Sequence, residues 1–127
     1  MAEKIRVLIA DDVEETRKNI KTLLEFEERI EVVGEAANGD EAIKVIDEVK
    51  PNLILMDINM PVMDGLRATE KITMHYPDIV VVIMSVQGEQ EYLKKAMLCG
   101  AKEYLIKPFS LEVLLDTVIE AFDREQE

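Results

Sequence analysis

Three carboxylates, a hydroxyl and an ammonium group in this chain could do chemistry together. Each of them lies at the end of an apolar run that could be a buried strand. The residues are Asp11, Asp12, Asp57, Ser85 and Lys107. The runs that precede them are 5–10, 53–56, 79–84 and 104–106. If the runs are parallel strands of one sheet, their carboxyl ends meet at one edge, where open α/β sheets bind ligands. The spacing therefore predicts a single charged site.

The acids in this set indicate metal and phosphoryl chemistry. Two carboxylates about 4 Å apart repel each other by roughly 4 kcal/mol at an effective dielectric near 20. A hard divalent cation removes that repulsion, and carboxylate, carbonyl and water oxygens are the ligands that Mg²⁺ takes. Lys107 and Ser85 can bind phosphate oxygens, and a carboxylate can itself act as a nucleophile. Alone, the paired acids could be a helix cap and Lys107 a solvated lysine; their coincidence at successive strand ends favours a site.

The elements that must position these residues alternate between strand and helix. Strands are expected at 4–10, 30–36, 52–56, 79–84 and 103–106, each followed by an amphipathic helical stretch. Asn38 is expected to cap the second helix, Asp64 to open the third and Gly100 to end the fourth. Val13 in the first helix and Met97 in the fourth are expected to face inward. This alternation predicts an α/β sandwich with a parallel sheet.

Composition limits the classes of protein. The 127 residues suit one domain with its own core. A formal net charge of -12 would repel nucleic acid and anionic lipid, so we expect neither nucleic-acid nor membrane binding. No apolar run reaches membrane-spanning length, and no signal peptide precedes the first strand. Cys99 is the only cysteine, which fits a reducing cytoplasm, the location we expect.

Four motifs together carry a resemblance to a known family. They are Ala10-Asp11-Asp12, the segment MDINMPVMDG at 56–65, Met84-Ser85 and the segment YLIKPF at 104–109. With them the chain resembles the receiver domains of bacterial two-component response regulators, of the chemotaxis-regulator type, over residues 5–121. The resemblance implies a flavodoxin-like (βα)5 three-layer sandwich whose five-stranded parallel sheet has the order 2-1-3-4-5. Residues 1–127 would form a single receiver domain, either a whole regulator or the N-terminal part of a longer one.

The resemblance also implies roles for individual residues. Asp57 would be the phosphoacceptor, and Mg²⁺ would be held by Asp11, Asp12, Asp57 and the backbone carbonyl of Asn59. Ser85 and Lys107 would bind the phosphoryl group, and Tyr104 fits the aromatic switch position. The Lys107–Pro108 peptide bond would be cis.

Three residues beside the site would tune its access and the phosphoryl lifetime. These are Asn59, Val86 and Gln87. Val86 stands where the family usually has Ala or Gly, so we expect its larger side chain to narrow access to Asp57. Asn59 and Gln87 are neither acids nor amines, so we expect neither an exceptionally long nor an exceptionally short lifetime.

The function implied is a signalling switch and not an enzyme that turns over external substrates. A sensor histidine kinase or histidine phosphotransfer protein would supply the phosphoryl group. The surface formed by helix 89–98, strand 103–106 and the last helix would then change and regulate an output domain or partner. A weak homodimer through this surface stays open, with no specific residue supporting it. Three alternative interpretations are a phosphatase, a phosphate-independent receiver-like domain and a flavin protein. A phosphatase would want an acid at position 59, where this chain has Asn59.

Overall fold

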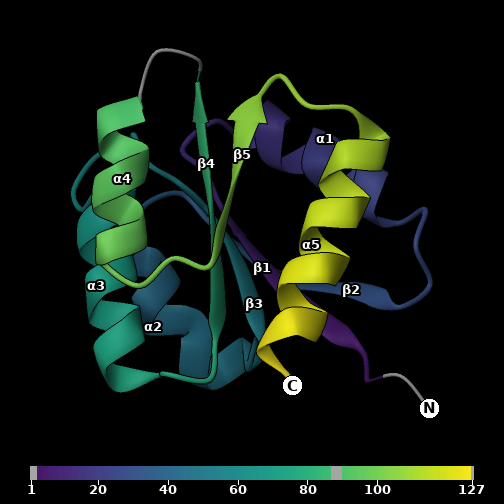
Figure 1. Cartoon of the computed structure of the whole chain (residues 1–127), viewed down its shortest axis with the longest axis horizontal. Helices are drawn as coiled ribbons and strands as arrows, with labels where there is room; N and C mark the ends of the chain where they lie inside the picture. Colours follow the sequence, from purple (N-terminus) through teal and green to yellow (C-terminus); the bar gives the residue numbers. More distant parts are fainter. Residues whose placement is uncertain (1–2, 87–89, 127) are drawn as a thin grey trace.

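The computed structural model describes residues 3–86 and 90–126, and these form a five-stranded parallel sheet between two layers of helices (Figure 1). The sheet order is β2-β1-β3-β4-β5, which confirms the predicted flavodoxin-like topology. The strands are β1 Ile5–Ala10, β2 Ile30–Ala36, β3 Leu53–Asp57, β4 Val80–Val86 and β5 Glu103–Lys107. The helices are α1 Glu14–Leu24, α2 Gly39–Val49, α3 Gly65–His75, α4 Gln90–Leu98 and α5 Leu111–Glu125.

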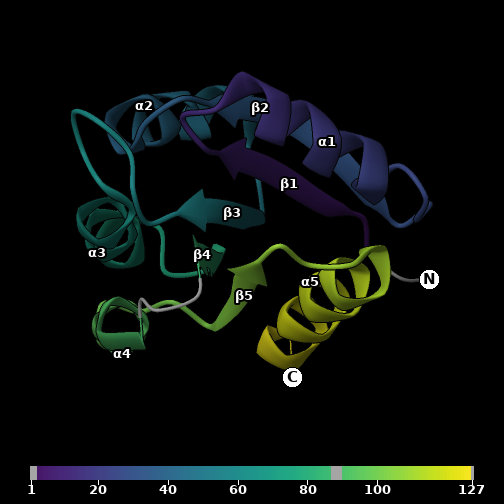
Figure 2. The ribbon, with the colours of Figure 1, turned by 90° about the horizontal axis from the view of Figure 1, so that it is seen from above.

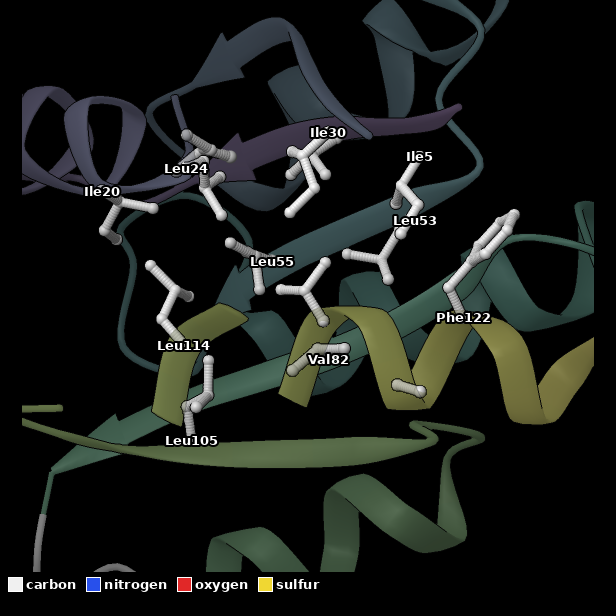
Figure 3. Close-up of a cluster of buried hydrophobic side chains, with 14 of the residues drawn as sticks. Ile5, Ile20, Leu24, Ile30, Leu53, Leu55, Val82, Leu105, Leu114 and Phe122 are labelled. Atoms are coloured by element: carbon white, nitrogen blue, oxygen red, sulfur yellow. The ribbon is translucent and has the colours of Figure 1, made fainter. Parts of the chain in front are cut away.

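Each face of the sheet has its own apolar core. Figure 2 shows α1 and α5 on one face and the other three helices on the opposite face. Alternate residues of β1 divide between them: Ile9 packs on the α1 and α5 side, and Leu8 packs on the α2, α3 and α4 side. Phe122 of α5 lies in the first core beside Leu53 (Figure 3) and is 1% exposed. The central strands are therefore buried on both faces, which explains their continuous apolar sequence.

Local signals in the sequence set most helix ends. The side chain of Asn38 accepts a hydrogen bond from the amide of Glu41, and Asp64 accepts one from the amide of Arg67. These bonds satisfy amides that have no partner within the first helical turn. Gly100 follows α4 with φ +112°, a left-handed conformation that glycine adopts without a side-chain clash. The expected roles of these residues at helix ends are confirmed.

Two expectations about inward-facing residues are wrong. Val13 is the N-cap of α1 in an extended conformation, and its side chain is half exposed because it precedes the first helical turn. Met97 is 41% exposed. Of the residues of α4, Gln90–Leu98, only Leu93 and Ala96 are buried. Met97 therefore lies at the margin of a narrow apolar stripe.

A β-bulge interrupts the pairing of β1 with β2. Residues 5–7 pair with 30–32, but residues 8–10 pair with 34–36, so Val33 is the extra residue. Because side chains alternate between the two faces of a strand, one extra residue transfers every later side chain to the other face. The bulge therefore places Glu35 level with Ile9, on the face that α1 covers.

Candidate functional site

Asp57 is the last residue of β3 and lies at the carboxyl edge of the sheet. Asp57 is only 7% exposed, so its carboxylate is nearly enclosed by protein. The chain turns sharply after it and enters α3 at Gly65, whose amide donates to the carbonyl of Ile58. A Cβ at Gly65 would lie 2.1 Å from the carbonyl oxygen of Asp57. Only glycine permits this close approach, and the turn therefore depends on it.

Asp11 and Asp12 follow β1, the neighbouring strand, and have different surroundings. Asp11 is fully buried, while Asp12 is exposed. One carboxylate oxygen of Asp11, Oδ1, accepts from the amide of Val13 at 2.9 Å, and the other, Oδ2, accepts from Lys107 Nζ at 2.7 Å. The carbonyl oxygen of Asp11 accepts from Arg17 at 2.6 Å. Asp11 is therefore held firmly, and Asp12 faces solvent.

The three carboxylates form a set that fits a divalent cation. One oxygen from each of Asp11, Asp12 and Asp57 lies within 4.8 Å of the other two. Ligand oxygens around an octahedral Mg²⁺ lie about 3–4 Å apart, given metal–oxygen distances near 2.1 Å. Asp12 is the exposed member of the three, so its side chain is free to adjust to that spacing. Asn59, the expected source of a carbonyl ligand, is an exposed residue two positions beyond Asp57.

Ser85 and Lys107 come from the two strands on the other side of Asp57. Lys107 ends β5 and places Nζ 3.6 Å from Oδ1 of Asp57. Ser85 lies near the end of β4 and is 1% exposed. Within residues 3–86 and 90–126, no group hydrogen-bonds to its hydroxyl. A buried hydroxyl without a partner is costly, so Ser85 has an unused donor at this edge of the sheet.

Burial and like charge act together on Asp57. The pKa of Asp57 is raised from the usual 3.8 to about 6. Desolvation is the largest cause, the charge of Lys107 opposes it, and the carboxylates of Asp11 and Asp12 add to the rise. The ionised carboxylate is therefore unfavourable in this environment, and a bound cation would stabilise it.

The remaining predicted residues lie near this edge or beside it. Tyr104 is on β5 with 45% of its surface exposed, and Val86 ends β4 with its side chain half exposed. The Lys107–Pro108 peptide bond is cis, as expected. Gln87 lies outside the described residues. Among residues 3–86 and 90–126, no helix is long and apolar enough to cross a membrane.

Arg17 is the residue at this site that the sequence did not reveal. Its guanidinium contacts the backbone of Asp11 and the carboxylate of Glu35. Its position six residues after Asp11 looks like an ordinary solvated helix position, because nothing local indicates the bulge that brings Glu35 to the same face.

The fold and this cluster of acids, hydroxyl and lysine define a class of protein, and comparison with known proteins agrees. Residues 7–119 match the response regulator receiver domain, so the chain belongs to this family of two-component signalling domains.

Individual relatives differ in how much of their length this chain spans. YhcZ of Bacillus subtilis, an uncharacterized transcriptional regulatory protein, is 41% identical over 113 residues, which are 89% of this chain and 53% of YhcZ. The chain likewise covers 49% of the transcriptional regulatory protein DegU of Brevibacillus brevis. It therefore spans about half the length of these two relatives. The chemotaxis protein CheY of Listeria monocytogenes is 40% identical over 120 residues, which are 94% of this chain and 97% of that protein.

Solved structures of receiver domains have the same fold. The receiver domain of AraT from Geobacillus stearothermophilus superposes with a TM-score of 0.86 at 28% identity, covering 96% of this chain and 98% of that one. The receiver domain of the putative response regulator NarL from Mycobacterium tuberculosis gives a TM-score of 0.89 at 27% identity, with the same coverage.

Proposed function

We propose that this domain is a phosphorylation-controlled signalling switch and that Asp57 receives the phosphoryl group. The observation that carries the proposal is the position of Asp57 among groups of complementary chemistry. Two further carboxylates lie on one side of it, while Lys107 and the unpaired hydroxyl of Ser85 lie on the other. The donor we propose is a phosphohistidine on a sensor kinase or phosphotransfer protein, or a small acyl phosphate.

In the proposed transfer, a carboxylate oxygen of Asp57 attacks the phosphorus atom of the phosphohistidine. The new P–O bond forms as the P–N bond to the donor breaks, and the imidazole leaves with the bonding electron pair and takes up a proton. Mg²⁺ held by Asp11, Asp12, Asp57 and the carbonyl of Asn59 would supply neutralising charge for the phosphoryl oxygens. Lys107 would pair with a phosphoryl oxygen, and Ser85 would donate its hydroxyl to another.

The aspartyl phosphate would then act through Ser85 and the strands beside it. A phosphoryl group adds about -1.5 to -2 charges and several acceptor oxygens. Attraction of Ser85 to these oxygens would move the end of β4, and exposed Tyr104 on β5 would turn inward into the space released. The surface of α4, β5 and α5 would change shape. The phosphate would thus shift an existing balance between two conformations.

The proposed role is regulation and not turnover of external substrates. A phosphatase that used Asp57 as nucleophile would want an acid at position 59, where this chain has Asn59. The chain would promote only its own phosphoryl transfer and dephosphorylation.

We propose that it regulates an output domain or a separate partner, since the relatives include both transcriptional regulators of twice its span and a chemotaxis protein of its own span. Its net charge of -12 and single cysteine support a cytoplasmic protein that does not bind nucleic acid directly.

Phosphorylation of defined variants tests the proposal. The wild-type protein, Asp57→Asn and Asp64→Asn would each be treated with Mg²⁺ and acetyl phosphate, and the adduct would be measured by intact mass and base lability. Asp64→Asn is the matched control, because Asp64 is an acid near the same site whose N-cap role asparagine also fills. We expect a single base-labile phosphoryl adduct in the wild type and the control and none in Asp57→Asn.

Structural consequences need a separate measurement. Amide chemical shifts recorded with and without beryllofluoride should change at Ser85 and Tyr104 in the wild type but not in Asp57→Asn. Equal phosphorylation of wild type and Asp57→Asn would refute the assignment of the phosphoacceptor. An adduct on Asp57 without shifts beyond its immediate neighbours would refute the switching role alone.

A further inference from the structure

Arg17 is a nearly buried link between helix α1 and the ends of two strands. Its side chain is 14% exposed. Nη1 donates to the carbonyl oxygen of Asp11 at 2.6 Å, and Nε donates to Oε1 of Glu35 at 3.0 Å. A guanidinium is planar and presents its donors in a rigid fork, so two simultaneous bonds determine its orientation. Arg17 therefore ties the end of β1 to β2 through α1.

The β-bulge makes this link possible. Glu35 pairs level with Ile9 because Val33 is the extra residue in β2. In an uninterrupted register Glu35 would lie level with Ala10 instead, on the face covered by α2. Bulges are common beside functional sites, where they redirect a side chain. Here the redirected side chain is the carboxylate that holds Arg17.

The bond from Arg17 acts on the backbone that leads into the proposed metal site. Both carboxylate oxygens of Asp11 are already engaged, by the amide of Val13 and by Lys107. The carbonyl of Asp11 belongs to the planar peptide unit that continues into Asp12. Orientation of that carbonyl therefore determines the direction in which exposed Asp12 leaves the strand.

We infer that Arg17, held by Glu35, is a positioning residue that sets the geometry of Asp11 and Asp12 for Mg²⁺ binding. The inference rests on the proposed function, because it assigns these two acids to the metal. Removal of groups that orient metal ligands typically weakens metal binding 10–100-fold. Arg17 itself does not touch the metal in this assignment, since its partners are a backbone carbonyl and Glu35.

Positioning and simple charge predict different effects of substitution, which gives a direct test. Arg17→Lys keeps the positive charge but loses the planar fork, so positioning predicts weaker Mg²⁺ binding and charge alone predicts no change. Arg17→Ala removes a positive charge near the acids, so charge alone predicts tighter binding and positioning predicts weaker binding. Glu35→Gln keeps an acceptor oxygen for Nε and should cause a smaller loss.

Mg²⁺ affinity would be measured by calorimetric titration of the whole chain, with Arg6→Lys as the matched control. Arg6 also donates to backbone carbonyls and to a glutamate of β2: its partners are Lys50, Val49 and Glu31. It lies near the amino end of β1, at the opposite end of the strand from the acids. Amide shifts and hydrogen exchange of Val13, which donates to Asp11, would report the local geometry independently of metal.

The expected result is Mg²⁺ binding about ten-fold weaker in Arg17→Lys and Arg17→Ala, with altered protection of the Val13 amide, while Arg6→Lys stays within about two-fold of wild type. Wild-type affinity in folded Arg17→Lys, or tighter binding in Arg17→Ala, would overturn the inference and leave the proposed function intact. A wild-type protein that binds no Mg²⁺ would overturn the proposed metal site and this inference with it.

Discussion

Lys107 lies closer to Asp11 than to the proposed phosphoacceptor: its Nζ is 2.7 Å from Oδ2 of Asp11 and 3.6 Å from Oδ1 of Asp57. Asp11 is fully buried, and Lys107 is its only charged partner among the ion pairs of the described residues. The lysine therefore compensates a buried carboxylate. In the proposed function, a short movement towards Asp57 would also bring it to a phosphoryl oxygen.

Replacement of this lysine should affect stability and titration together. Lys107→Met leaves buried Asp11 without its cation, so the free energy of unfolding should fall by about 2–4 kcal/mol. The pKa of Asp57 should rise above about 6, because Lys107 is the charge that lowers it. Urea unfolding and NMR titration of the Asp57 carboxyl carbon would measure the two effects. Lys18→Met, at an exposed pair with Glu14, is the control and should change neither. An unshifted Asp57 titration would contradict this account.

The raised pKa of Asp57 predicts a specific dependence of stability on pH. Between the unfolded value of 3.8 and the folded value of about 6, the folded protein binds more protons than the unfolded chain. Stability should therefore fall as pH rises through this window, by up to about 3 kcal/mol at Asp57. The measurement is the difference in unfolding free energy between wild type and Asp57→Asn from pH 4 to 7 without Mg²⁺. Saturating Mg²⁺ should reduce the difference near pH 7, and a difference that does not vary with pH would rule out the raised pKa.

Gly65 should tolerate no side chain, because its Cβ would meet the Asp57 carbonyl oxygen at 2.1 Å. Gly65→Ala should lower the unfolding free energy by at least about 2 kcal/mol and displace Asp57, which would also weaken Mg²⁺ binding. Gly34→Ala is the matched control, since its Cβ would meet only side-chain methyl groups, those of Val49 at 3.3 Å and Leu8 at 3.4 Å. Thermal unfolding and calorimetric titration would compare the two variants. Equal losses in both would show that the close approach at Asp57 is unimportant.

Val62 is a β-branched residue with φ +68° and 85% exposure, in the loop between β3 and α3. Left-handed conformation costs an L-residue about 1–2 kcal/mol, and an exposed side chain recovers little of it by burial. Val62→Gly should therefore raise the unfolding free energy by about 1 kcal/mol, measured by urea unfolding. Val113→Gly provides a control of opposite sign, because exposed Val113 lies in helix α5 and glycine there should destabilise. A loss of stability in Val62→Gly would contradict the prediction.

Val86 follows Ser85, the residue proposed to bind the phosphoryl group, and is half exposed. We predict that Val86→Ala opens access to Asp57 and speeds both phosphorylation by acetyl phosphate and spontaneous loss of the phosphoryl group. Both rates would be followed at fixed Mg²⁺ concentration. Val113→Ala, an exposed valine on α5, serves as the control and should leave both rates unchanged. If Val86→Ala also leaves both unchanged, Val86 does not limit access.

The sequence by itself determined the alternation of strands and helices and the residues at the strand ends. Apolar runs broken by Asp57, Ser85 and Lys107 are visible without coordinates, and the rule that parallel strands share a carboxyl edge brings such residues together. Caps such as Asn38 were predictable because a capping bond joins residues only three apart.

Only the tertiary structure decided which of these groups pair and which side chains are covered. The bond between Lys107 and Asp11 joins residues 96 positions apart, so it depends on strand order and register and not on any local pattern. The bulge at Val33 moves the side chain of Glu35 to the opposite face of the sheet, where it contacts Arg17. The weak alternation in the sequence of β2 does not reveal this change of face. Met97 fits a helical stripe yet is exposed, because the area covered depends on how the helix packs against its neighbours. Local periodicity predicts elements, whereas pairing across the sheet needs the three-dimensional register.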